Sequence, residues 1–119
     1  KGKSKSELAK ISIDHQDLPK VIKRLKIATL IQYTLYGVPS VYYGDEVGLE
    51  GYTDPLNRKC FPWGNENTEI LSWFRFLGKF RSENPVFKRG DTDVIYAKDG
   101  CIVYKRFDEN NDVAVAINL

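Results

Sequence analysis

The sequence is poor in the residues that most metal and redox sites use. It has 119 residues with no methionine, one histidine and two cysteines. Cys60 and Cys101 lack the spacing of a metal site, so we expect no metal and no cofactor. The net charge of +2 is too small to indicate nucleic acid or a membrane surface as a partner. No apolar run is long enough to cross a bilayer.

The missing methionine also bears on where the chain begins. Residue 1 is a lysine, and the first ten residues, KGKSKSELAK, are polar and do not form a signal peptide. We expect an internal piece of a longer protein; a start that was removed or omitted is the alternative. The sequence allows a disulfide between Cys60 and Cys101 but does not require one. We expect two unpaired thiols, which favour a reducing compartment such as the cytoplasm.

What the sequence does contain is typical of a globular domain. The hydrophobic fraction is 42%, and apolar residues recur at helical spacing over residues 19–36. Asp17 is expected to cap this helix, with Pro19 in the first turn and Gly37 ending it. The segment Asp14-His15-Gln16-Asp17 invites a metal or acid–base interpretation, but a lone histidine favours a solvated entry into the helix.

A second helix is predicted over residues 67–83, with Thr68 as its cap. Apolar and aromatic side chains cover most of its circumference, so it must be buried on more than one side. In a chain that stands alone, we expect this helix to drive self-association, for example as a homodimer.

The pattern changes after Asn84-Pro85, which ends the second helix. Residues 94–96, 101–107 and 113–119 alternate in polarity and predict three antiparallel strands. Asp99-Gly100 is a tight hairpin signal. The apolar face of this meander needs a further layer, for which we expect another sheet.

Between the helices lies the stretch GVPSVYYGDEVGLEG, residues 37–51. Residues 40–43 are β-branched and aromatic and predict a short buried strand. Asp45 and Glu46 follow it and suggest an acid–base pair. Neighbours on an extended chain point to opposite faces, however, so we interpret them as structural.

Residues 44–67 form a long irregular loop, and loops of this length are usually functional. Asp54 and Arg58 offer a carboxylate acceptor and a forked donor that suit sugar hydroxyls. Tyr52, Phe61 and Trp63 offer flat faces for a pyranose ring. The residues alone leave a second interpretation open, in which Asp54 and Arg58 form an internal ion pair and Trp63 a small core.

The stretch GVPSVYYGDEVGLEG resembles the motif after the last barrel strand of the α-amylase family of glycoside hydrolases. The run from Thr53 to Trp63, TDPLNRKCFPW, resembles its neopullulanase, cyclomaltodextrinase and amylopullulanase branch, and the match covers roughly residues 20–119. The resemblance implies an α/β then β fold. Residues 1–84 would hold the last helix–strand–helix portion of a TIM barrel, and residues 85–119 the first strands of an antiparallel β-sandwich.

The same resemblance implies an enzyme that cleaves α-glucosidic bonds in maltodextrins, cyclodextrins, pullulan or starch with retention of configuration. Its catalytic carboxylates would lie upstream, so we expect no catalytic residue in this chain and an inactive isolated chain. Asp54 and Arg58 match the positions that bind a glucose unit. The alternatives are a non-catalytic scaffold, such as the amino-acid transporter heavy chains, and a glycan-binding module.

Overall fold

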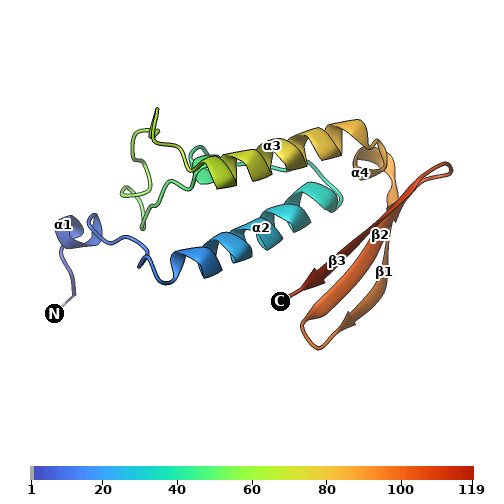
Figure 1. Cartoon of the computed structure of the whole chain (residues 1–119), viewed down its shortest axis with the longest axis horizontal. Helices are drawn as coiled ribbons and strands as arrows, with labels where there is room; N and C mark the ends of the chain where they lie inside the picture. Colours follow the sequence, from blue (N-terminus) through green and yellow to red (C-terminus); the bar gives the residue numbers. More distant parts are fainter. Residues whose placement is uncertain (1) are drawn as a thin grey trace.

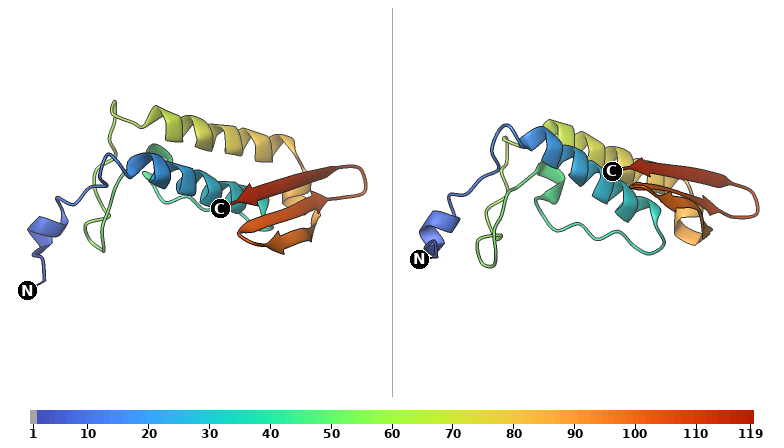
Figure 2. Two further views of the ribbon diagram at one scale, coloured as in Figure 1. Left: turned by 60° about the horizontal axis from the view of Figure 1, so that its bottom comes forward. Right: turned by 90° about the horizontal axis from the view of Figure 1, so that it is seen from below.

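The computed structural model describes residues 2–119, which form two long helices with a sheet at one end of them (Figures 1 and 2). Helix α2 (Leu18–Thr34) and helix α3 (Thr68–Glu83) lie side by side. A short helix α4 (Val86–Arg89) leads from α3 into the sheet. The N-terminal segment lies at the end of the helices away from the sheet.

The N-terminal segment contains a short helix α1 (Lys5–Leu8) that was not predicted. Ser4 and Glu7 cap it reciprocally: the Ser4 hydroxyl accepts from the Glu7 amide, and the Glu7 carboxylate accepts from the Ser4 amide. This is the Ser-x-x-Glu signature of a capping box, so the signal was present in the sequence.

Helix α2 confirms the first predicted helix, with a difference at its cap. Asp17 occupies the cap position, but its side chain makes no capping hydrogen bond. The buried residues of α2 are Ile22, Thr29 and Thr34, because the helix is covered on two sides. Its first half packs on α3, where Ile22 contacts Ile70 and Phe74.

Helix α3 matches its predicted range, but Asn67 caps it in place of Thr68. The Asn67 Oδ1 accepts from the amides of Glu69 and Ile70, both at 3.1 Å. An amide side chain just before the first turn satisfies donors that the helix itself cannot. Phe74 and Leu77 are buried, whereas Phe76 keeps 52% of its surface exposed.

The sheet confirms the predicted meander. It consists of β1 (Asp91–Lys98), β2 (Cys101–Phe107) and β3 (Asp112–Asn118), antiparallel and in that order. Asp99 and Gly100 form the β1–β2 turn with positive φ angles of 53° and 77°.

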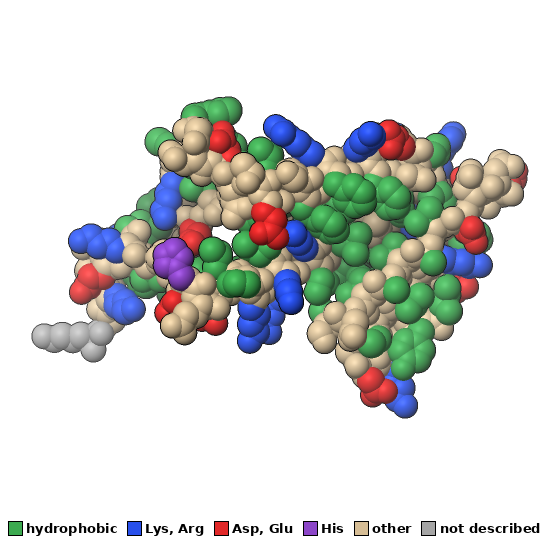
Figure 3. Space-filling model, in the orientation of Figure 1, with side chains coloured by type: hydrophobic (Ala, Val, Ile, Leu, Met, Phe, Trp, Pro, Cys, Tyr) green, Lys and Arg blue, Asp and Glu red, His purple; other side chains and the backbone are tan. Residues whose placement is uncertain are grey.

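Helix α2 covers the inner face of β2 and β3, where we had expected a second sheet. Tyr104, Val115 and Ile117 are buried there, against side chains from the second half of α2. Strand β1 remains exposed along its whole length. Hydrophobic side chains gather over α3 and over the sheet on the face shown in Figure 3.

A polar cluster joins the sheet to the end of α2. The Arg106 side chain has no exposed surface, and its guanidinium donates to four backbone carbonyls, with N–O distances of 2.7–3.2 Å. The acceptors are the carbonyls of Thr34, Val86, Gly90 and Asp91. The Thr34 and Tyr104 hydroxyls lie 2.5 Å apart beside it. The cluster therefore ties α2, α4 and the sheet together.

The strand predicted over residues 40–43 is not formed in this structure. Residues 38–42 have no regular structure, Val38 is 93% exposed, and the Tyr42 and Tyr43 rings lie together at 4.9 Å. A strand needs a neighbour to satisfy its backbone groups, and no strand of residues 2–119 pairs with this segment. The helix–strand–helix expected here is a helix, an unpaired segment and a helix.

The length and apolar character of the helices can be compared with those of a membrane span. Across residues 2–119, no helix combines the length and the apolar character that a membrane span requires.

Candidate functional site

The candidate site is built on a tight turn within the loop between α2 and α3. The Leu56 amide donates to the Thr53 carbonyl at 2.9 Å, and the Arg58 amide donates to the Pro55 carbonyl at 3.1 Å. This turn brings Asp54 and Arg58 together, so that Arg58 Nε donates to Asp54 Oδ1 at 2.7 Å. The two predicted site residues therefore meet as an ion pair.

This ion pair lies on the surface. The side chains of Arg58 and Asp54 are 67% and 61% exposed. An exposed pair contributes at most about 1 kcal/mol to folding, so it gives the loop little stability. Within residues 2–119, the guanidinium uses only Nε in side-chain hydrogen bonds, which leaves donors free for a hydroxylated ligand.

The three aromatic side chains of the loop form two groups. The Phe61 and Trp63 rings lie 4.4 Å apart, and Trp63 is 79% exposed. An exposed indole of this kind does not form the small core that the alternative interpretation required. Tyr52 instead lines a cleft of about 220 Å³, together with Tyr42, Tyr43, Asp45, Leu49, Gly51 and Asn57.

Two contacts hold the loop against the preceding segment and against itself. The Tyr43 hydroxyl donates to the Lys59 carbonyl at 3.0 Å, next to Arg58. Gly51 lies so close to Asn57 that a Cβ at position 51 would come within 2.8 Å of the Asn57 Cα. Close approach of two backbones explains why glycine stands at position 51.

Asp45 and Glu46 do not lie on an extended chain, as the sequence argument assumed. They belong to a short 3₁₀ helix, η1 (Asp45–Val47), entered through Gly44 with a φ of 95°. Glu46 accepts from the Gly44 amide at 2.8 Å. Burial, and then the charge of Glu46, raise the pKa of Asp45. Glu46 thus stabilises the backbone of the turn, a structural role.

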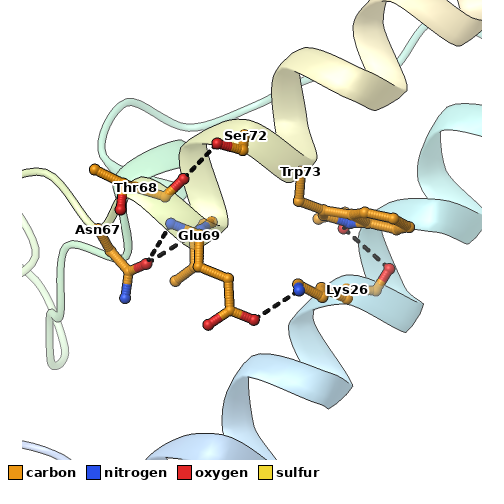
Figure 4. Close-up of polar contacts among 8 residues, drawn as sticks. Lys26, Asn67, Thr68, Glu69, Ser72 and Trp73 are labelled. Carbon is orange, nitrogen blue, oxygen red and sulfur yellow. Dashed lines mark hydrogen bonds and ion pairs between the residues drawn. The ribbon is translucent and has the colours of Figure 1, made fainter.

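Polar contacts between α2 and α3 fix the far end of the loop (Figure 4). Lys26 Nζ and Glu69 Oε1 form an ion pair at 2.7 Å, and the Trp73 indole donates to the Thr29 hydroxyl at 2.9 Å. Asn67, which caps α3, also donates its amide to the Val47 carbonyl at 3.2 Å. Sequence reasoning missed these contacts, since they join residues that lie far apart in the chain, more than 40 positions for the two contacts between α2 and α3.

The described residues offer few side chains for metal binding or thiol chemistry. Within the described residues, no three histidine, cysteine or acidic side chains gather in a way that could hold a metal ion. Cys60 is exposed and Cys101 is partly buried, and both are free thiols, as expected.

No protein-family model matches the chain, whereas curated proteins do. It is 44% identical over 85 residues to an amylopullulanase of Thermoanaerobacter thermohydrosulfuricus, covering 71% of this chain and 6% of that enzyme. It is 35% identical over 100 residues to a cyclomaltodextrinase of Thermoanaerobacter pseudethanolicus, covering 82% of this chain and 17% of that enzyme. The chain thus spans less than a fifth of either relative.

Solved structures give the same result. A debranching enzyme from Nostoc punctiforme matches with a TM-score of 0.77 and 39% identity, over 82% of this chain and 20% of that one. An α-amylase from Geobacillus thermoleovorans, complexed with acarbose, matches with a TM-score of 0.76 and 36% identity, over 82% of this chain and 22% of that one. The chain therefore belongs to the α-amylase family of glycoside hydrolases and corresponds to one part of those longer enzymes.

Proposed function

We propose that the chain is part of an enzyme that cleaves α-glucosidic bonds in maltodextrins, cyclodextrins, pullulan or starch, with retention of configuration. The observation that carries the proposal is its sequence identity of 35–44% to an amylopullulanase and a cyclomaltodextrinase. The names of these relatives state the substrates on which they act. The proposal extends that chemistry to the enzyme to which this chain belongs.

Within that enzyme, residues 1–84 would form the last helix–strand–helix portion of a TIM barrel and residues 85–119 the start of a β-sandwich. The order of α2, the segment 38–43 and α3 supports the first part, because this segment would become a strand beside barrel neighbours. The three antiparallel strands after α4 support the second part.

Asp54 and Arg58 would bind a glucose unit, and the chain would contribute binding rather than catalytic groups. Their exposure supports this role, since both charged groups are open to solvent and contribute little to folding. A sugar hydroxyl can donate to the Asp54 carboxylate while its neighbour accepts from the Arg58 fork. The exposed Trp63 ring lies in the same loop and offers an apolar face.

Calorimetric titration of the 119-residue chain with maltotriose tests this proposal. We expect binding, and we expect Asp54→Ala and Arg58→Ala to abolish it with no change in the circular dichroism spectrum. Asp93→Ala is the matched control, because Asp93 is an exposed carboxylate on strand β1. Binding that survives both loop substitutions would reject the assigned residues, and release of reducing sugar by the chain alone would reject a purely binding role.

The apolar surface of α3 supports a further proposal, that the isolated chain self-associates through residues 67–83. Phe76 is 52% exposed and lies between Trp73 and Phe80, with ring centroids 5.5 and 5.7 Å away. Exposed aromatic surface of this kind favours association in water. Light scattering measures the mass of the particles in solution. Phe76→Ser is expected to lower this mass, and a monomeric mass for the unsubstituted chain would reject the proposed self-association.

A further inference from the structure

The C-terminal end of α2 is held by two arginines that come from different parts of the chain. Arg81 of α3 donates through Nη1 to the Tyr33 carbonyl at 2.6 Å and to the Leu35 carbonyl at 3.3 Å. Arg106 of β2 donates to the Thr34 carbonyl, between them, at 2.7 Å. The last carbonyls of a helix have no partner within the helix and carry its negative end, so two cations satisfy and stabilise them.

Arg81 also reaches beyond the helix. Its Nη2 donates to the Gly37 carbonyl at 2.5 Å, at the start of the segment 38–43. Gly37 has a φ of 110°, a left-handed conformation that side chains disfavour, and it turns the chain away from α2. One planar guanidinium thus fixes the helix end and the turn that follows it, which a lysine cannot do with a single ammonium.

The segment 38–43 then runs to the candidate loop, held by hydrogen bonds at three points. Arg81 holds its start, the Gln32 side chain donates to the Ser40 carbonyl at 2.5 Å, and Tyr43 holds the Lys59 carbonyl. Within residues 2–119, Val38 is 93% exposed and Tyr42 half exposed, so burial does not fix the path of this segment in the chain itself. Its direction depends on the hydrogen bonds, and the last of them ends beside Arg58.

From this series of contacts we infer that Arg81 is a positioning residue for the Asp54–Arg58 loop. It sets the exit of the chain from α2 and, through the segment 38–43, the place where Tyr43 anchors the loop. Arg106 holds the same helix end from the sheet, so the sheet supports the loop at a distance. This inference rests on the proposed sugar binding by that loop.

The test compares Arg81→Lys with Arg75→Lys in the 119-residue chain. Arg75 is an exposed arginine on the same helix and serves as the matched control. We expect Arg81→Lys to weaken maltotriose binding about 3- to 10-fold, the effect of losing a hydrogen bond that orders the site. The NMR shifts of the backbone carbonyl carbons are expected to change at residues 37–43 and 59, because the hydrogen bonds that hold this segment are accepted by carbonyls. Amide hydrogen exchange in α3 and the sheet is expected to keep its protection.

The outcomes separate the two proposals. Unchanged maltotriose binding in Arg81→Lys, with binding lost in Asp54→Ala, overturns the positioning role and leaves the proposed function intact. Exchange that accelerates evenly over α3 and the sheet shows a merely structural arginine and also overturns it. If the parent chain itself does not bind maltotriose, the sugar-binding proposal fails, and the positioning role fails with it.

Discussion

Two arginines show how differently the two ends of this molecule use the same side chain. At the junction of α2 and the sheet, Arg106 is fully buried and donates to four backbone carbonyls. In the loop before α3, Arg58 is two-thirds exposed and donates to the carboxylate of Asp54. A buried guanidinium surrounded by carbonyls serves the architecture, whereas an exposed one beside a carboxylate remains available to a ligand.

The largest expected difference in stability separates two variants, each of which lacks one of these guanidinium groups. Arg106→Leu takes a donor away from four backbone carbonyls, of which, within residues 2–119, only that of Val86 is shown to keep another, the Gly90 amide at 2.9 Å. Each buried group left unmet costs about 1–3 kcal/mol. We expect a loss of at least about 3 kcal/mol in the free energy of unfolding, or a chain that does not fold. Arg58→Leu is expected to stay within about 1 kcal/mol. Urea denaturation measures both, and similar losses in the two variants would show that the comparison is wrong.

Two tyrosine hydroxyls allow the same comparison at smaller scale. Tyr104→Phe removes the hydroxyl that pairs with Thr34 inside the junction, although Thr34 still donates to the Leu30 carbonyl at 2.6 Å. We expect a cost of about 1 kcal/mol, the net value of one buried hydrogen bond. Tyr43→Phe removes the exposed hydrogen bond to Lys59, for which we expect about half of that or less. A larger loss at Tyr43 in thermal denaturation would contradict this ranking.

The sequence predicts the junction better than the loop, for a physical reason. The helices and the β-meander follow from periodicity and from Asp99-Gly100, because their partners lie nearby in this chain. The strand predicted at residues 40–43 is absent because no strand within residues 2–119 pairs with it. Arg106 was missed, although it alternates with Ile102 and Tyr104 along one strand, and side chains at alternate positions share one face of a sheet.

The loop shows a different limit of sequence reasoning. The spacing of Asp54 and Arg58 left an ion pair and a sugar site equally open, and the structure shows the ion pair at 2.7 Å. Their role in binding stays a prediction. It is compatible with the ion pair, because both charged groups are exposed and either can exchange the other for a ligand. Asn67 was passed over in favour of Thr68 as the helix cap, a shift of one residue that periodicity does not resolve.

The smallest expected effect is the opposite pH response of two carboxyl groups. Burial and the charge of Glu46 raise the pKa of Asp45, at the start of the loop. In the β2–β3 turn, the backbone amides of Asn110 and Asn111 donate to Asp108 at 3.0 and 2.9 Å, and the hydrogen bond from Asn110 is the main cause that lowers its pKa. The ordinary pKa of both groups is 3.8, so the pKa of Asp45 lies above this value and the pKa of Asp108 lies below it.

The signs follow from linkage, because the state with the higher pKa binds the proton more tightly. Asp45 has its higher pKa in the folded chain, so acidification from neutral pH through that raised pKa toward 3.8 stabilises the fold. Asp108 has its lower pKa in the folded chain, so its contribution to the stability of the fold is complete above 3.8 and is lost as the pH falls through the lowered value.

Carboxyl-carbon NMR titration measures both pKa values directly. We expect Asp45→Asn to stabilise the chain at neutral pH and Asp108→Ala to destabilise it, with both differences shrinking in acid, because protonation then makes each parent carboxyl neutral. If both pKa values were raised, burial would govern both carboxyl groups, and the exposed turn would then not differ from the partly buried start of the loop.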